Sequence, residues 1–342
     1  WNSKDREICD ETYRDLVGDS SRDWNESIVN LFAQEGIIFR NPGKEPGNYV
    51  ITSVYDALGG HIVADALLKK HSHDRDFKWL NDPSVISAFS GDQTHPLSND
   101  IFRSLVALVP SQMYGEQLWR NIPENFKQAA LFYTADLNPD HIDEETVNAL
   151  AELITEKSQS RRNIFSRLWL TKSTLKHPLN ANFLNRVLLN LSVDERDLSW
   201  TEWVRSEKDF SKDRIAPELE ELEDKWKSDL TQRTEADCLR AKAIKWLLTS
   251  TNNPLRNDTT RALYWFGRGN PEFLFDETIE SFEINDPYVP ERMLAASYGV
   301  AMSLSVNLSN GSAFTSGTLS KFAGQIFEAM FKENAPYTTT HQ

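Results

Sequence analysis

The chain has 342 residues, 39% of them hydrophobic and 26% charged, a composition typical of a folded protein rather than of a disordered one. Its 51 acidic side chains outnumber its 37 lysines and arginines, and the net charge of −14 disfavours general binding to nucleic acid or to anionic membranes. Two cysteines, Cys9 and Cys238, are too few for a disulfide framework, and no signal segment opens the chain, so we expect a cytoplasmic protein with buried thiols.

Residues 1–72 are predicted to form a small winged-helix domain. Apolar residues repeat at helical spacing in three segments, and two short apolar runs flank a stretch rich in Pro and Gly, which indicates a β-hairpin between the second and third helices. We expect the helices at residues 4–17, 23–35 and 54–70, and the hairpin strands at residues 37–39 and 49–52.

The second of these helices argues against DNA binding. A helix that enters the major groove faces closely spaced phosphates and therefore needs cations. The segment from Asp23 to Glu35 contains no Lys or Arg, and the hairpin adds only Arg40 and Lys44. We therefore expect this domain to pack against protein.

The chain after residue 72 reads as helical to its end, so the predicted fold class is mainly α. We expect a helical region at residues 73–210 and stacked HEAT/TPR-like repeats, an α-solenoid array, at residues 211–342. Helices are predicted at residues 97–108, 124–134, 143–157, 161–169, 181–191, 217–230, 236–249, 257–267, 271–284 and 287–304.

Two internal similarities support this division. The motif His-Pro-Leu occurs at His95 and again at His177, and Pro followed by Ser or Asn predicts a helix start at each place. Further on, the pattern around Asn253-Pro254 recurs after 33 residues at Asp286-Pro287, and each copy leads into a helix with alanines. A period of this size is typical of stacked helix pairs.

An uncharged stretch runs from Met293 to Ser320 and raises the question of a membrane span. Its serines and asparagines interrupt the apolar run well short of the roughly 20 residues that a bilayer requires. We expect a buried helix followed by a loop.

No catalytic motif is recognised in the sequence. The segment Gly43-Lys44-Glu45 lacks both the preceding glycine and the following Ser or Thr of a Walker A loop. The acidic run Asp143-Glu144-Glu145 is expected to mark a helix start, where negative charge is favoured, and Trp200 and Trp203 are expected in the core. We predict no catalytic and no metal-binding residue in this chain.

One polar segment keeps an enzymatic alternative open. His71, His73, Asp74 and Asp76 are close enough in sequence to ligate a metal ion, as in a metal-dependent hydrolase. A solvated linker between two helical segments explains the same residues, because no further ligand motif accompanies them.

Several segments resemble a known family. Residues 36–40, the hairpin and residues 49–68 are similar to the winged-helix end of a STAND NTPase module, in particular that of bacterial antiviral ATPases of the Avs (AVAST) type. There, a Tyr-centred segment leads into a helix with His-hydrophobic-hydrophobic-Ala, which corresponds here to Tyr55 and His61-Ile62-Val63-Ala64. The resemblance covers most of the chain and continues through residues 177–184, 195–204 and 286–299.

The resemblance implies a helical sensor arm attached to a nucleotide-driven oligomerisation switch. ATP with Mg²⁺ would bind in a module upstream of Trp1, together with an effector, and this chain would hold no cofactor of its own. The recognised partner would be a phage structural or packaging protein, and the full-length parent would self-associate. Tyr55, Asp56 and His61 would lie near the nucleotide; Val54-Tyr55-Asp56 corresponds to a Met-His-Asp motif of the family, with Tyr in place of His.

Three other functions stay open on the sequence alone. A winged-helix transcription regulator with a helical ligand-binding body is one, and the metal-dependent hydrolase is the second. A scaffold without a foreign ligand is the third.

Overall fold

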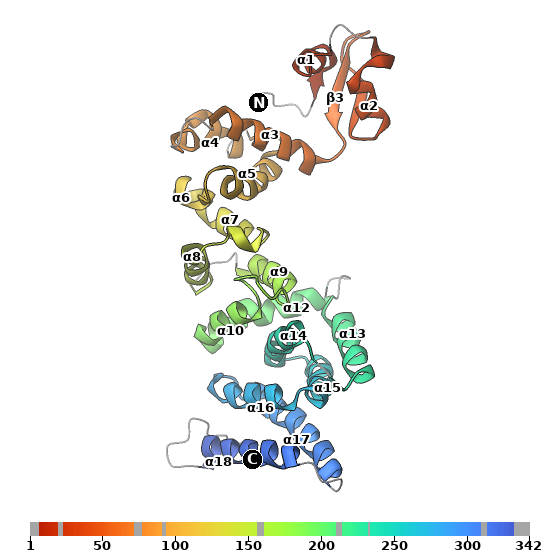
Figure 1. Cartoon of the computed structure of the whole chain (residues 1–342). Coiled ribbons are helices and arrows are strands. Elements are labelled where there is room, and N and C mark those ends of the chain that lie inside the picture. The colour runs from red at the N-terminus through yellow and green to blue at the C-terminus, as the bar shows by residue number, and fades with distance from the viewer. Residues whose placement is uncertain are drawn as a thin grey trace. The chain divides into compact units, whose positions relative to one another are not determined.

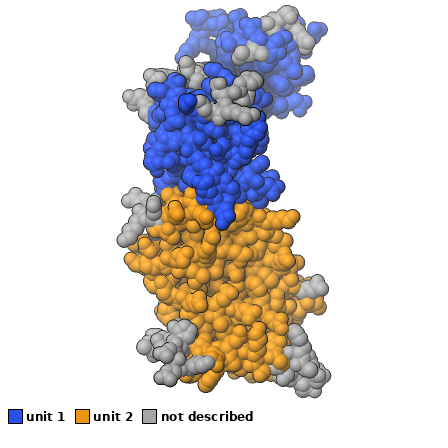
Figure 2. Space-filling view, turned by 60° about the vertical axis from the view of Figure 1, so that its left-hand side comes forward, with its two compact units in different colours: residues 1–146 blue, residues 147–342 orange. Residues whose placement is uncertain are grey.

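The computed structural model describes residues 7–19, 23–71, 77–90, 94–155, 161–209, 214–231, 233–308 and 313–331. It is mostly helical, with one small antiparallel sheet near the N-terminus followed by a helical array (Figure 1), so the predicted fold class is confirmed. Contacts divide the chain into two compact units, residues 1–146 and residues 147–342 (Figure 2). None of the described helices is both long and apolar enough to cross a membrane.

The first unit begins with a three-stranded sheet and two short helices. The strands are β1 (Ile8–Cys9), β2 (Ile38–Pro42) and β3 (Tyr49–Ser53), and β3 is central with an antiparallel neighbour on each side. Val29 of α2 packs with Ile38 and Ile51 of the sheet to form a small core. The helices are α1 (Asp10–Leu16) and α2 (Ile28–Gln34), the latter preceded by the short 3₁₀ helix η1 (Trp24–Glu26).

The predicted order of helix, helix, hairpin and helix is present, but the first two helices begin later than predicted, the second at Ile28 after its N-cap Ser27. The first predicted helix was placed at residues 4–17, but Ile8 and Cys9 instead pair with Ile51 and Val50 of β3 as a two-residue strand. The helix begins only at Asp10, because the extended Ile8-Cys9 pair completes the sheet.

The third predicted helix, α3 (Asp56–His71), packs mainly on α5 rather than on the sheet. A Cβ added to Gly60 would lie 2.6 Å from the main-chain carbon of Asp100 and 2.8 Å from the nitrogen of Ile101, so the two helix backbones nearly touch. The remaining helices of this unit are η2 (Lys78–Asn81), α4 (Pro83–Phe89), α5 (Ser98–Gln112), α6 (Leu118–Asn121), α7 (Glu124–Thr134), η3 (Pro139–His141) and the start of α8 (Glu144–Thr155).

The described residues of the second unit form helices joined by turns and loops, without a strand among them. Its short irregular helices are the π-helical turn η4 (Asp197–Thr201) and the 3₁₀ turns η5 (Trp246–Thr249) and η6 (Ser281–Glu283). Its α-helices are α9 (Arg161–Thr171), α10 (Ala181–Asn190), α11 (Val193–Arg196), α12 (Glu202–Asp209), α13 (Ile215–Ser228), α14 (Glu235–Lys245), α15 (Asn253–Gly269), α16 (Pro271–Glu280), α17 (Tyr288–Leu308) and α18 (Ala313–Phe331).

Helices two apart in sequence lie side by side in this unit. α13 packs on α15 and α15 on α17, while α16 contacts both α15 and α17, and α18 contacts α16 and α17. Glu223 and then Trp226 of α13 lie next to Arg261 and then Phe266 of α15. Asn257 and then Tyr264 of α15 lie next to Arg292 and then Gly299 of α17, so the three helices run in the same direction. The expected stacked helical array is therefore present.

The two units do not coincide with the three predicted domains. The boundary after residue 72 falls between α3 and α5, whose backbones are in close contact. The boundary after residue 210 falls inside the second unit, because the Nε1 of Trp200 donates a hydrogen bond of 3.0 Å to the carbonyl of Trp246. Long-range packing thus ties together segments that the sequence pattern separates.

Candidate functional site

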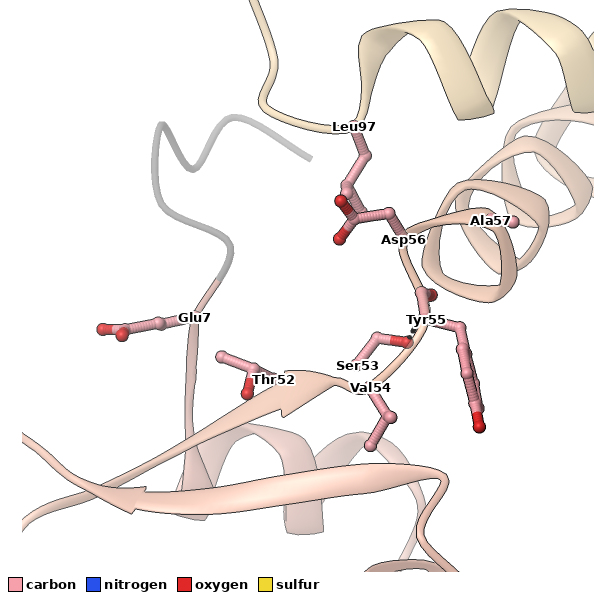
Figure 3. A pocket seen from close by; sticks show the side chains of 8 residues that line it. All are labelled: Glu7, Thr52, Ser53, Val54, Tyr55, Asp56, Ala57 and Leu97. Carbon is pink, nitrogen blue, oxygen red and sulfur yellow. Dashed lines mark hydrogen bonds between the residues drawn. The ribbon is translucent and has the colours of Figure 1, made fainter. Parts of the chain in front are cut away.

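A pocket of about 610 Å³ lies at the junction between β3 and α3 (Figure 3). It contains two of the three residues that the family resemblance places near a nucleotide. Its lining residues are Glu7, Thr52, Ser53, Val54, Tyr55, Asp56, Ala57 and Leu97.

The turn from strand to helix fixes the position of these residues. The hydroxyl of Ser53 donates a hydrogen bond of 2.9 Å to the carbonyl of Tyr55, and the amide of Val54 donates one of 3.1 Å to Ile37. Asp56 is the first residue of α3, where the unpaired amides of the helix start favour a carboxylate. This local role explains Asp56 without any ligand.

The predicted residues are only partly brought together. Figure 3 shows the carboxylate of Asp56 on the side of the hollow that Leu97 closes, whereas the ring of Tyr55 points away from it. The side chain of Tyr55 is 64% exposed. His61 is exposed on α3 and does not line the pocket; it contributes, after the hydrogen bonds from Lys69 and Gln112, to the lowered pKa of Asp65.

The lining does not fit the phosphates of a nucleotide. Glu7 and Asp56 carry negative charge, Thr52 and Ser53 supply hydroxyls, and no Lys or Arg is among the described lining residues. Phosphate groups are held by cations or by clustered backbone amides. A nucleotide contact of Tyr55, Asp56 or His61 stays a prediction, and Asp56 could accept a hydrogen bond only from a sugar hydroxyl or a base amino group.

The alternative metal site is only partly within the described residues. His71 stacks on Trp79 with ring centroids 4.7 Å apart and the planes nearly parallel, which gives it a packing role at the end of α3. His73, Asp74 and Asp76 lie outside the described residues. Over the part of the chain that the structure describes, no three metal-binding side chains come together.

A second pocket of about 370 Å³ lies among α10, α14 and α16 and contains Cys238, Lys242 and Phe273. Burial raises the pKa of the Cys238 thiol, and the side-chain amide of Asn270 donates a long hydrogen bond of 3.7 Å to its sulfur. A thiol with a raised pKa is a poor nucleophile at neutral pH. The expectation that both thiols are buried is wrong for Cys9, which is exposed in the short strand β1, and Cys238 is half-buried.

Several buried charged side chains of the second unit have polar partners within the fold. Lys245 and Glu277 lie 2.7 Å apart, and Lys172 lies 2.8 Å from Glu218. Arg196 is fully buried and donates a hydrogen bond of 2.6 Å to the side chain of Asn285. Such partners lie far apart in sequence, so no sequence pattern indicated them.

Aromatic rings lie beside cations on α13, α15 and α17, where Tyr264, Trp265 and Arg268 are half-buried and Lys227 and Tyr298 are exposed. We call Lys227, Tyr264, Trp265, Arg268 and Tyr298 the aromatic surface. The ammonium of Lys227 lies 5.5 Å from the ring of Trp265, and the guanidinium of Arg268 lies within 6 Å of the rings of both Tyr264 and Trp265. The next helix continues this surface, because Tyr264 packs against Gly299 and the neighbouring Tyr298 is 68% exposed.

Helix α2 exposes apolar residues where a DNA-reading helix would carry cations. Ile28 is 40% exposed and Leu31 is 54% exposed. Arg40, one of the two cations of the hairpin, is held by Asp10 at 2.8 Å and lies over the rings of Trp24 and Tyr49. This geometry agrees with the expectation that the domain packs against protein.

Two further sequence predictions, for the tryptophan pair and for the acidic run before α8, are confirmed. Trp200 and Trp203 are buried in a cluster with Trp169 and Phe165. Asp143 precedes α8, and its carboxylate accepts the amide hydrogen of Thr146 at 2.9 Å.

Comparison of the chain with protein-family models, with curated proteins and with solved structures gave no match.

Proposed function

We propose that this chain is the sensor part of a cytoplasmic antiviral ATPase of the STAND type. In this proposal the helical array binds a foreign protein, such as a phage structural or packaging protein, and binding is relayed to a nucleotide-binding module upstream in the parent protein. The chain itself hydrolyses nothing, and ATP with Mg²⁺ belongs to the upstream module. The resemblance of residues 36–68 to that family suggests the type of parent protein. The aromatic surface is the structural feature that supports binding of a protein partner.

The aromatic surface is the observation that carries this proposal. Trp, Tyr and Arg contribute most of the binding energy at protein interfaces, because they are large and rigid and also form hydrogen bonds. On α15 the guanidinium of Arg268 donates a hydrogen bond of 3.0 Å to the hydroxyl of Tyr264, which holds both groups in place before a partner arrives. A preorganised surface loses less conformational entropy on binding.

Purified phage structural and packaging proteins titrated against the chain test the proposal. We expect Trp265→Ala and Arg268→Glu each to weaken binding about tenfold or more, as truncation of a central interface residue does. Arg205→Glu is the control, since it makes the same charge reversal at an arginine on α12 whose side chain is 52% exposed. Equal binding by all three variants, or no binding by the unmodified chain, would count against the proposal.

The transcription-regulator alternative has a separate test. Duplex DNA is titrated at low and at high salt, because binding to phosphates weakens steeply as salt rises. We expect no salt-sensitive binding, since α2 exposes Ile28 and Leu31 and carries no cation.

A further inference from the structure

The outer face of α18 is apolar although no described element covers it. Phe327 is 60% exposed and Phe331 is 61% exposed. Gly317, Ser320 and Gly324 continue the same line towards the start of the helix, at the spacing that keeps residues on one face. We call these five residues the α18 stripe. A contiguous row of exposed apolar residues on a folded protein indicates a binding surface.

The inner face of α18 is firmly packed, which makes the stripe a fixed surface. The ring of Phe322 stacks on Phe275 of α16, with centroids 4.0 Å apart and planes nearly parallel. The hydroxyl of Thr318 donates a hydrogen bond of 3.3 Å to Glu272. A groove of about 510 Å³ runs beside the stripe and is lined by Ile279, Lys321, Gly324, Gln325, Glu328 and Ala329.

The shape of the α18 stripe is complementary to itself. One half consists of small residues, and no heavy atom lies within 4 Å of a Cβ added to Gly317 or Gly324. The other half carries the two phenylalanines. If two copies of α18 lie antiparallel with Gly324 near the centre, the large half of each helix meets the small half of the other. Phe331 then comes opposite Gly317, and Phe327 comes next to Ser320.

The charges beside the stripe have the same symmetry. Lys321 and Glu328 flank it on the side of the groove, and both are exposed. The antiparallel arrangement that matches the shapes also places Lys321 of each copy next to Glu328 of the other. Lys321 is held only loosely within its own chain, at 3.8 Å from Asp276. A two-fold interface requires this kind of self-complementarity.

We propose that a second copy of this chain docks on the α18 stripe, with the two α18 helices antiparallel about a two-fold axis near Gly324. The inference is independent of the proposed sensor function, because it uses only the surface of α18. Analytical ultracentrifugation of the full chain over a concentration series measures the dimer directly. A chain that stays monomeric at about 100 μM would overturn the proposal.

Phe327→Glu tests the apolar part of the interface. It removes a ring from each half of the dimer and places a carboxylate there, so we expect the dissociation constant to rise about a hundredfold or more. Circular dichroism and the thermal midpoint check that this variant stays folded. An unchanged dissociation constant in the folded variant would contradict the antiparallel pairing.

Charge exchange separates docking from folding. Lys321→Glu and Glu328→Lys each create two like-charged pairs in a homodimer, so we expect each variant alone to dimerise about tenfold more weakly. An equimolar mixture of the two variants restores both opposite-charge pairs and should form a heterodimer about as stable as the original dimer. Lys69→Glu, on α3, is the control with another lysine paired to an aspartate. If mixing restores nothing, the proposed arrangement is wrong.

Discussion

The ammonium of Lys245 lies 2.7 Å from a carboxylate oxygen of Glu277, and their side chains are 1% and 6% exposed. This pair joins η5 and the end of α14 to the middle of α16. The second oxygen of Glu277 lies 2.9 Å from Lys242. Burial alone would lower the pKa of Lys242, but the charges of Glu277 and Glu280 raise it. One carboxylate therefore compensates two lysines inside the second unit.

Removal of Glu277 should destabilise this unit strongly. Glu277→Ala leaves Lys245 buried without its carboxylate, and breaking a buried ion pair costs about 3–5 kcal/mol. Urea unfolding followed by circular dichroism measures the loss. Arg205→Ala breaks an exposed pair with Glu202 and should cost less than about 1 kcal/mol. Equal losses in the two variants would show that the buried pair has no special role.

Gly60→Ala should loosen the contact between α3 and α5. The added methyl group would collide with the main chain of Asp100, which cannot move without shifting α5, and overpacking of this kind costs about 1–3 kcal/mol. The free energy of unfolding of the first unit is the measured quantity. Gly59→Ala, in the same helix, is the control, since its methyl group would meet mainly the end of the flexible Leu97 side chain, at 2.9 Å, and should cost less than Gly60→Ala. A neutral Gly60→Ala would mean that the helices can separate.

His95 should make the first unit less stable in mild acid. Its Nδ1 accepts the amide hydrogen of Leu97 at 3.0 Å, and burial lowers the pKa of the imidazole. The unfolded histidine, with a pKa of about 6.5, therefore binds a proton more readily than the folded one. Stability is fully retained above pH 6.5 and falls as the pH drops through the interval between the two pKa values.

His95→Asn isolates this effect, because asparagine can accept the same amide hydrogen without titrating. Relative to the variant, the original chain should lose unfolding free energy as the pH falls from 7 towards 5. Parallel stability curves for the two proteins would contradict the role assigned to His95.

Arg233→Ala should separate two helix ends. Its guanidinium donates hydrogen bonds to the carbonyls of Trp226 and Trp265, both at 2.7 Å, and so joins the end of α13 to that of α15. Hydrogen bonds from charged donors contribute about 1.5–3 kcal/mol each, and we expect a loss of at least about 3 kcal/mol in thermal or urea unfolding. Arg233→Lys should rescue only part of it, because lysine lacks the Nε that donates to the carbonyl of Phe266 at 3.1 Å and the Nη1 that donates to the carbonyl of Asp229.

The helix starts were the most predictable part of this fold. His95-Pro-Leu and His177-Pro-Leu were predicted to open helices, and α5 and α10 do begin directly after them. The structure adds the reason, since in each motif the histidine Nδ1 accepts the amide hydrogen two residues later. Capping chemistry is local, so it can be read from a few adjacent residues.

Contacts between distant segments could not be predicted in the same way. The strand β1 has two residues, and its partner Ile51 lies more than forty positions from Ile8. Judged by helix propensity, Gly60 only weakens α3. Its role is to let α3 approach the main chain of Asp100 in α5, and this contact is not visible in the sequence. The start of α18, up to Ser320, lies in the stretch predicted to be a loop, because its glycines and serines hide an apolar face that only the packing of Phe322 on Phe275 reveals.

The sequence predicted where the candidate site lies along the chain, but not how its side chains are oriented. The sequence indicated the segment around Tyr55 and Asp56, and a pocket does lie there. The direction in which each side chain points depends on the turn that Ser53 fixes, and that turn sends Tyr55 outward. The aromatic surface was missed because its members come from three helices whose alignment is set by packing.

The shared direction of α13, α15 and α17 has an electrostatic consequence. The last carbonyl oxygens of a helix carry partial negative charge, and parallel packing places the ends of α13 and α15 along one edge. Lys227, Arg233 and Arg268 lie at that edge. An otherwise acidic protein thus places cations there to offset the partial negative charge, and strong salt should loosen that edge before it affects the apolar interior.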